Sequence, residues 1–103
     1  MIQIIFEKQS QRFFLLFELY KQSNANIDYA TNVQNIAFNQ GLGLRSFTPA
    51  WKYLQMEGLI KVRPGSQNYL ASITHSGIKA IEEVFFNEND PTYYFPAYRE
   101  MSH

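Results

Sequence analysis

Cations, hydroxyls and amides that could recognise a nucleic acid gather between residues 45 and 68 of this chain. Arginine and lysine attract the phosphates of a duplex, and hydroxyl and amide groups can donate to or accept from base edges. Arg45 and Lys52 would belong to one helix, and Lys61 and Arg63, two residues apart, would share one face of a strand. The residues that we expect to make such contacts are Arg45, Ser46, Thr48, Lys52, Tyr53, Gln55, Lys61, Arg63, Gln67 and Asn68.

Catalytic and metal-binding sites lack the residues that they need. The chain has no cysteine, and its two histidines, His75 and His103, have no second ligand at metal-binding spacing. Glu82 and Glu83 are adjacent and point apart on a helix, so they cannot act as a catalytic pair. Gly41-Leu42-Gly43 is not followed by the third glycine that a phosphate-binding loop requires. We therefore expect no enzymatic activity, no cofactor and no metal.

A helix has to position the first group of candidate contact residues. Apolar residues recur at three- and four-residue spacing and predict a helix over about 46–57, which Gly58 ends. Pro49 is acceptable only in the first turn of a helix, so either Ser46 or Thr48 is the expected N-cap. The face opposite the apolar one would then carry Lys52, Tyr53 and Gln55.

The chain before this helix predicts two more helices. Apolar residues with helical period predict a first helix that ends near Gln22. Thr31 and Gln34 have the spacing of a capping box, which predicts a second helix that ends at Gly41. Residues 27–30, between these two helices, could form a short strand.

The chain after it predicts a two-stranded ribbon and a fourth helix. Strands are expected over 59–62 and 69–73, and the Pro64-Gly65 turn between them would form the tip of a wing over about 61–69. Thr74 is the expected N-cap of the fourth helix. The fold class that these elements predict is mainly α with a small β-ribbon, a winged helix-turn-helix, over residues 1–90.

Charge is unevenly distributed along the chain, although the formal net charge is zero. Residues 41–80 carry a formal charge of +4, and residues 81–103 carry −4. The positive segment coincides with the third helix and the wing, where a duplex would be bound.

Two short motifs in this region carry a family resemblance. The first is Pro49-Ala50, with Trp51 at a large apolar position, Leu54 and then Gly58-Leu59-Ile60; the second, after the ribbon, is Ile73-Thr74-His75-Ser76-Gly77. Over about residues 31–86 the chain resembles the winged-helix transcriptional regulators of the PadR family, within the broad PadR and MarR group. The resemblance implies a third helix in the major groove and a wing on the DNA backbone. The front of the chain and its short fourth helix depart from that family's pattern.

An aromatic, proline-interrupted tail over residues 91–103 follows the fourth helix. Tyrosine and phenylalanine are favoured at interfaces, so the tail could cover a partner protomer, or it could close over its own core. The first helix carries apolar residues, Ile2 and Ile5 among them, on more than one side. We expect a homodimer formed through the first helix, the fourth helix and the tail.

The function that these features predict is DNA-binding regulation of transcription, with double-stranded DNA as the partner. Zero net charge and the aromatic tail also fit a winged-helix module that binds only proteins, and the aromatic content also fits an effector pocket near the dimer interface. The longest unbroken apolar run, residues 13–17, is far too short to span a bilayer, and the first residues lack the features of a signal peptide. We therefore expect a cytoplasmic protein with no membrane partner.

Overall fold

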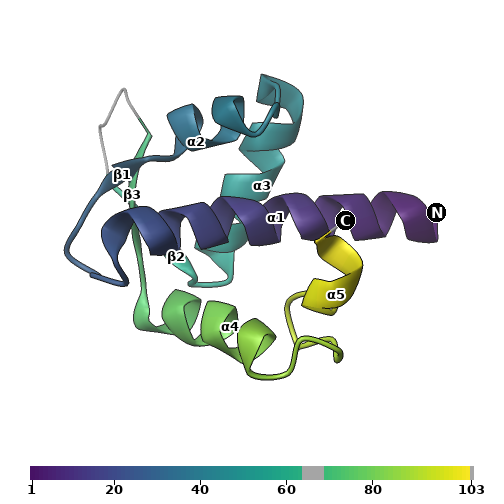
Figure 1. Cartoon of the computed structure of the whole chain (residues 1–103). Coiled ribbons are helices and arrows are strands. Elements are labelled where there is room, and N and C mark those ends of the chain that lie inside the picture. The colour runs from purple at the N-terminus through teal and green to yellow at the C-terminus, as the bar shows by residue number, and fades with distance from the viewer. Residues whose placement is uncertain (64–68, 103) are drawn as a thin grey trace.

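A long first helix lies across the middle of the molecule, with the other elements on its two sides (Figure 1). The structure, a computed structural model, describes residues 1–63 and 69–102. Helices α2 and α3 lie on one side of α1, and α4 and α5 lie on the other. The helices are α1 (Ile2–Ser23), α2 (Val33–Asn39), α3 (Leu44–Met56), α4 (His75–Phe86) and α5 (Tyr98–Met101); the strands are β1 (Thr31–Asn32), β2 (Ile60–Val62) and β3 (Leu70–Ile73).

The described part of the chain is therefore mainly helical, with a small antiparallel sheet in the order β1-β3-β2. The central strand β3 pairs with β2 in the register Ile60 to Ile73, and with β1 in the register Thr31 to Ala71. The β2–β3 hairpin was expected, and its strands agree with the prediction to within one residue. Its tip is not among the described residues, so Gln67 and Asn68 lie outside them.

The core is built around the middle of α1. Phe13, Leu15, Leu16 and Leu19 are buried there between α3, the sheet and α4. The apolar stripe expected from the sequence differs at its start, because Ile2 and Ile5 are exposed. The first turns of α1 extend beyond the elements that cover its middle (Figure 1).

Helix α2 begins one residue later than its sequence predicts, and a different side chain caps it. Asn32 is the N-cap, and its Oδ1 accepts hydrogen bonds from the backbone N–H groups of Gln34 (3.0 Å) and Asn35 (3.2 Å). Thr31, the expected cap, instead pairs with Ala71 in the sheet. The predicted capping box is therefore wrong, because Thr31 belongs to a strand. The predicted strand over 27–30 is also wrong, because the strand in this part of the chain is Thr31–Asn32.

Helix α3 begins earlier than expected, at Leu44, with Gly43 as its N-cap. Neither Ser46 nor Thr48 caps it, and Pro49 lies inside the helix. A proline there removes the hydrogen bond to the carbonyl of Arg45, and Pro49 is exposed, so water can reach that carbonyl. Burial of Phe47 against the core favours the extra turn at the N-terminus.

Helix α4 and the tail close the other side of the core. Thr74 caps α4 as predicted, because its Oγ1 accepts a hydrogen bond from the N–H of Gly77 (3.1 Å). The tail folds back on its own chain: Phe95 and Met101 are buried, and the ring of Phe95 lies 5.4 Å from that of Phe13. The first residues of α5 are half-buried or exposed, and Tyr98 lies against Phe85. Within the described residues, no helix combines the length and apolar character needed to cross a membrane.

Candidate nucleic-acid interface

The outward side of α3 presents a stripe of four exposed residues. Phe47, Ala50 and Leu54 point into the core, so the helical repeat sends the stripe in the opposite direction. Successive members of the stripe are three or four residues apart, as neighbours on one helix face must be. These residues, which we call the α3 stripe, are Arg45, Pro49, Lys52 and Met56.

The other expected contact residues of α3 lie on the flanks of this stripe. Thr48, half-buried, and Gln55, exposed, lie on one flank. Ser46 and Tyr53 lie on the opposite flank, the one that faces α1, and both are half-buried. The stripe with Thr48 and Gln55 is thus the part of α3 that could enter a groove.

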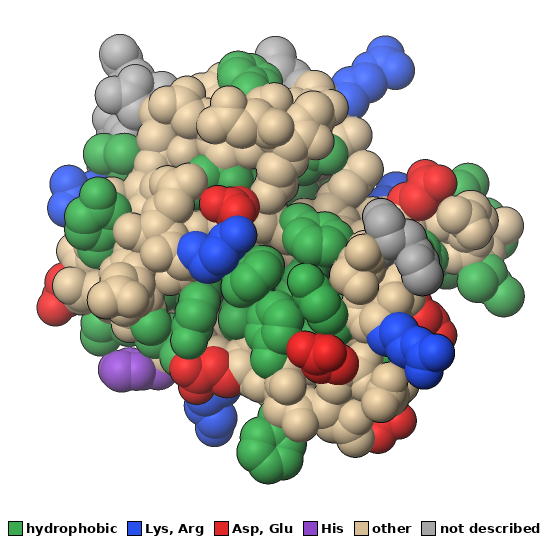
Figure 2. Space-filling view, viewed as in Figure 1, with side chains coloured by type: hydrophobic (Ala, Val, Ile, Leu, Met, Phe, Trp, Pro, Cys, Tyr) green, Lys and Arg blue, Asp and Glu red, His purple; other side chains and the backbone are tan. Residues whose placement is uncertain are grey.

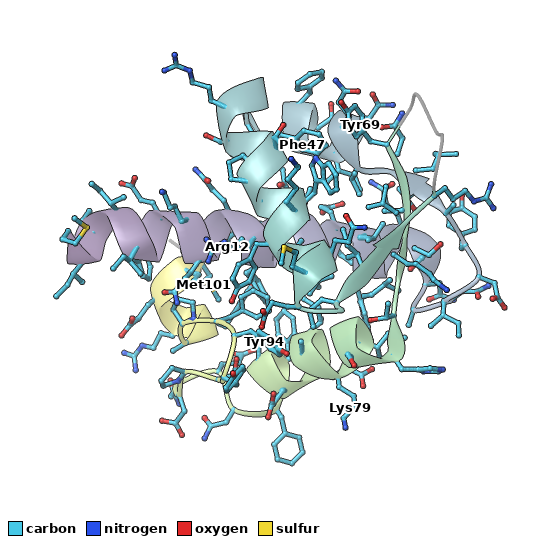
Figure 3. All side chains as sticks on the ribbon, turned by 180° about the vertical axis from the view of Figure 1, so that it is seen from behind. Arg12, Phe47, Tyr69, Lys79, Tyr94 and Met101 are labelled. Atoms are coloured by element: carbon cyan, nitrogen blue, oxygen red, sulfur yellow. The ribbon has the colours of Figure 1, made fainter. Side chains whose placement is uncertain are left out.

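Tyr53 does not face outward as the sequence predicted. Its ring packs against the core, and the guanidinium of Arg12 lies over it, with Cζ 3.8 Å from the ring centroid. Figure 3 shows Arg12 where α3 crosses α1. The helical period alone placed Tyr53 outside, but at this position α3 meets a second helix rather than solvent.

The residue before β3, on the tip side of the hairpin, makes aromatic contacts with α3. The ring of Tyr69 lies 5.6 Å from that of Phe47, edge to face, and 5.9 Å from that of Trp51. Tyr69 adopts a left-handed conformation with φ 51°, which is uncommon for a tyrosine and is stabilised here by these contacts. Two aromatic residues of α3 therefore contact the chain where it enters β3.

The hairpin cations are exposed, and Lys61 lines a hollow that includes no residue of α3. Lys61, on β2, and Arg63, the residue after β2, flank half-buried Val62, in keeping with alternation along a strand. Lys61 lines a hollow of about 340 Å³ together with Asp28 and His75, and α3 contributes no residue to it. The structure therefore does not place Lys61 on the surface of the α3 stripe.

The cations of this region have no carboxylate partner in the described part of the chain. Among residues 1–63 and 69–102, the ion pair is the one between Lys21 and Glu18, one turn apart on α1. Two acidic residues of the C-terminal part have other surroundings: Asp90 accepts a hydrogen bond from Asn87 (2.6 Å), and Glu100 lines a groove beside the start of α1. The positive charge on α3 is therefore available to an external anion.

Two cations of α1 complete this surface, and sequence reasoning missed them. Lys8 and Arg12 line a cavity of about 150 Å³ together with Arg45 and Ser46 of α3. Their four-residue spacing puts them on one face of a helix, which was the available signal. The crossing of α1 over α3 that brings them to Arg45 is a long-range contact and has no local signature.

No protein-family model, curated protein or solved structure matches this chain. The described residues also contain no cluster of three or more histidine, cysteine, aspartate or glutamate side chains that could hold a metal ion. The features of the molecule that indicate a function are the α3 stripe, the hairpin and the cations beside them.

Proposed function

We propose that this chain is a DNA-binding transcriptional regulator with a winged helix-turn-helix fold, PadR-like in its third helix and wing. Helix α3 enters the major groove, and the β2–β3 hairpin lies along the backbone. The observation that carries the proposal is the α3 stripe, in which Arg45 and Lys52 are exposed and pair with no carboxylate among the described residues. A major groove admits a helix, and unpaired cations on that helix gain most from the phosphates.

The arrangement of elements supports this proposal. Helices α2 and α3 are joined by a short turn in which Gly41 adopts φ 79°, and α3 is followed directly by the hairpin and then by α4. Thr48 and Gln55 flank the stripe with groups that can hydrogen-bond to base edges. In this arrangement phosphate contacts set the register and the two neutral side chains supply sequence preference.

The protein acts as a homodimer in this proposal. One protomer offers few cations to the DNA, and a dimer would double them and read two half-sites about 34 Å apart. The exposed start of α1 supports a dimer, because Ile2 is 83% exposed and lies beside a groove of about 340 Å³ formed with the tail. Hydrophobic side chains also gather between α1 and α4, bordered by acidic ones (Figure 2).

The test is fluorescence anisotropy of labelled duplex fragments at low and at high salt. Replacing Arg45 and Lys52 together by alanine should weaken binding and lower the slope of log K against log salt by about 0.9 for each phosphate that the variant no longer neutralises. Lys79→Ala is the matched control, because Lys79 is exposed on α4 (Figure 3), on the side of α1 opposite α3, and should change neither quantity. Absence of any binding by the wild-type protein at low salt would reject the proposal.

A second candidate function is a winged-helix module that binds only proteins. The observation in its favour is exposed aromatic surface away from α3: Phe86 is 95% exposed and Tyr93 is 86% exposed. Isolated exposed aromatics are common on proteins, so they weigh less than the unpaired cations of α3. The same anisotropy measurement separates the two functions.

A further inference from the structure

We propose that the cleft between α1 and α3 is a binding site for a single phosphate group. The cleft is formed by Lys8 and Arg12 of α1 and by Arg45 and Ser46 of α3. We call it the α1–α3 cleft. It depends on the packing of the two helices and includes residues of α1, so it differs from the α3 stripe, with which it shares Arg45 and Pro49.

The charge that lines the cleft has one sign. Three of its side chains are cationic, the polar remainder is neutral, and no carboxylate lines it. Glu7, the acid nearest to Lys8 in the sequence, is exposed and does not line the cleft. Lys8 and Arg12 repel each other at four-residue spacing on the helix, and Arg45 adds to that repulsion. An anion in the cleft would convert this unfavourable arrangement into a favourable one.

Arg12 is already held in a conformation suited to an oxyanion. Its guanidinium lies over the ring of Tyr53, with Cζ 3.8 Å from the ring centroid, and Tyr53 is half-buried. A stacked guanidinium keeps its in-plane N–H groups free, and these match the oxygens of a phosphate. No hydrogen bond or ion pair joins Arg12 to another described side chain. Because Tyr53 already holds the guanidinium in place, Arg12 loses little conformational entropy when it binds a phosphate.

The volume of the cleft limits the size of the ligand that it can hold. Its volume of about 150 Å³ corresponds to roughly five water molecules at about 30 Å³ each. Cavities for whole small molecules begin at about 300 Å³, so a nucleotide would not fit. One phosphate group fits, with the rest of its molecule outside the cleft.

That phosphate has two possible sources. It can be a phosphodiester of a duplex bound on α3, since Arg45 and Ser46 belong both to the cleft and to the start of that helix; this source depends on the proposed function. It can also be free phosphate or the phosphate of a small molecule, which does not depend on DNA binding. Both sources use the same three cations.

The first experiment is a titration with inorganic phosphate at constant ionic strength, followed by NMR of backbone and arginine side-chain N–H signals. Wild-type protein should show saturable shifts at Arg12 and at the first turns of α3. The double variant Lys8→Gln/Arg12→Gln should bind phosphate at least about tenfold more weakly, because hydrogen bonds between charged groups are removed. Lys79→Gln is the control and should bind as wild type does. Should the double variant unfold, Lys8→Gln alone replaces it, because Lys8 is exposed and lines only the cleft.

The second experiment repeats the DNA titration over a range of salt concentrations with the same variants. If DNA supplies the phosphate, Lys8→Gln/Arg12→Gln should lower the salt slope by about 0.9, the value for one phosphate, and weaken all sequences alike. Saturable phosphate binding with an unchanged DNA slope, or with no DNA binding at all, supports the cleft and identifies free phosphate as its ligand. The proposal is overturned if phosphate gives no response that the double variant weakens and the DNA slope is also unchanged. Failure of DNA binding alone rejects only the proposed function.

Discussion

Asn32 shows how a single side chain decides where a helix begins. Its Oδ1 accepts from two backbone N–H groups of α2, whereas the hydroxyl of Thr31 is buried without a hydrogen-bond partner. We predict that Asn32→Ala lowers the free energy of unfolding by about 1 kcal/mol, the usual cost of losing an N-cap. Thr31→Val should leave it unchanged or raise it, because an unsatisfied hydroxyl is replaced by a methyl group.

Urea unfolding followed by circular dichroism measures both variants. Asn35→Ala is the control, since Asn35 is exposed on the same helix and only its backbone N–H meets the cap. A larger loss for Thr31→Val than for Asn32→Ala would restore the capping box that the sequence suggested.

Gly77 is a position at which adding a single methyl group should lower the free energy of unfolding. A Cβ added there would lie 2.1 Å from the carbonyl oxygen of Leu59 and 2.8 Å from Cγ1 of Ile73. Alanine favours a helix by about 1 kcal/mol over glycine, yet we predict that Gly77→Ala destabilises by about 2 kcal/mol or more, because backbone must move. Gly43→Ser also adds a Cβ, but nothing lies within 4 Å of it, so it should be neutral or stabilising. Thermal unfolding of the two variants measures both changes, and a Gly77→Ala variant as stable as the wild-type protein would contradict the prediction.

At the scale of elements, the sequence predicted four helices and the β2–β3 hairpin in their observed order, but not β1 or the short helix α5, and it missed the starts of α2 and α3. The hairpin and the cap of α4 were predictable because their signals are local: a Pro64-Gly65 turn between two short apolar runs, and a threonine directly before a helical pattern. The start of α3 was not, because burial of Phe47 outweighs the preference of Pro49 for a first turn. Likewise, the helical repeat alone predicted that Arg45 and Lys52 are exposed. The contact of Arg12 with Tyr53 could not be predicted in this way, because it forms only where α1 and α3 cross.

Helices α1 and α4 are linked by a hydrogen bond that should make stability depend on pH. The Tyr20 hydroxyl donates to Oε2 of Glu82 (2.8 Å), and this bond, helped by partial desolvation and by the carboxylate charge, raises the pKa of Tyr20 above its ordinary value. A pKa raised by folding means that the stabilisation is complete below about pH 10 and is lost as the pH rises through the folded value. We predict that Tyr20→Phe shows a smaller loss of stability at alkaline pH than the wild-type protein.

The measurement is urea unfolding at neutral and alkaline pH, together with an ultraviolet titration of tyrosinate. Glu82→Gln should remove most of the rise in the pKa of Tyr20, and Glu83→Gln, at the adjacent exposed position, should not. Equal titration curves for Glu82→Gln and the wild-type protein would contradict this account.

The tail acts as part of the core of its own chain. Thr92 and Phe95 close a turn through the Thr92 N–H, which donates to the Phe95 carbonyl (2.8 Å), and the Phe95 ring is 2% exposed. We predict that Phe95→Ala lowers the free energy of unfolding by about 3–5 kcal/mol, as for other buried phenylalanines. Tyr93→Ala, two residues away and exposed, should cost less than about 0.5 kcal/mol. Denaturant unfolding measures the free energy of unfolding of both variants. An equal decrease for Phe95→Ala and Tyr93→Ala would mean that the tail does not cover this core.

At the scale of the whole molecule, charges and apolar surface are separated. Lys8, Arg12 and Arg45 line one cavity. The acidic residues Glu82, Glu83 and Asp90 line a different hollow, together with Lys79, and the exposed start of α1 lies beside the tail. A dimer formed through the start of α1 would leave the α1–α3 cleft and the α3 stripe of each protomer open. Zero net charge is therefore compatible with binding to a polyanion, because the charge that matters is local.

We predict that substituting one exposed apolar residue changes both the oligomeric state and the strength of DNA binding. We expect Ile2→Glu to convert a dimer into a monomer of 12.1 kDa in light scattering, because Ile2 is exposed beside the apolar groove. Met56→Glu, which places the same charge at an exposed position of α3, should keep the dimer mass. In the DNA titration, Ile2→Glu should roughly halve the salt slope, because one protomer contacts half as many phosphates as two. A monomeric wild-type protein with an unchanged slope in Ile2→Glu would instead mean that each chain binds its site alone.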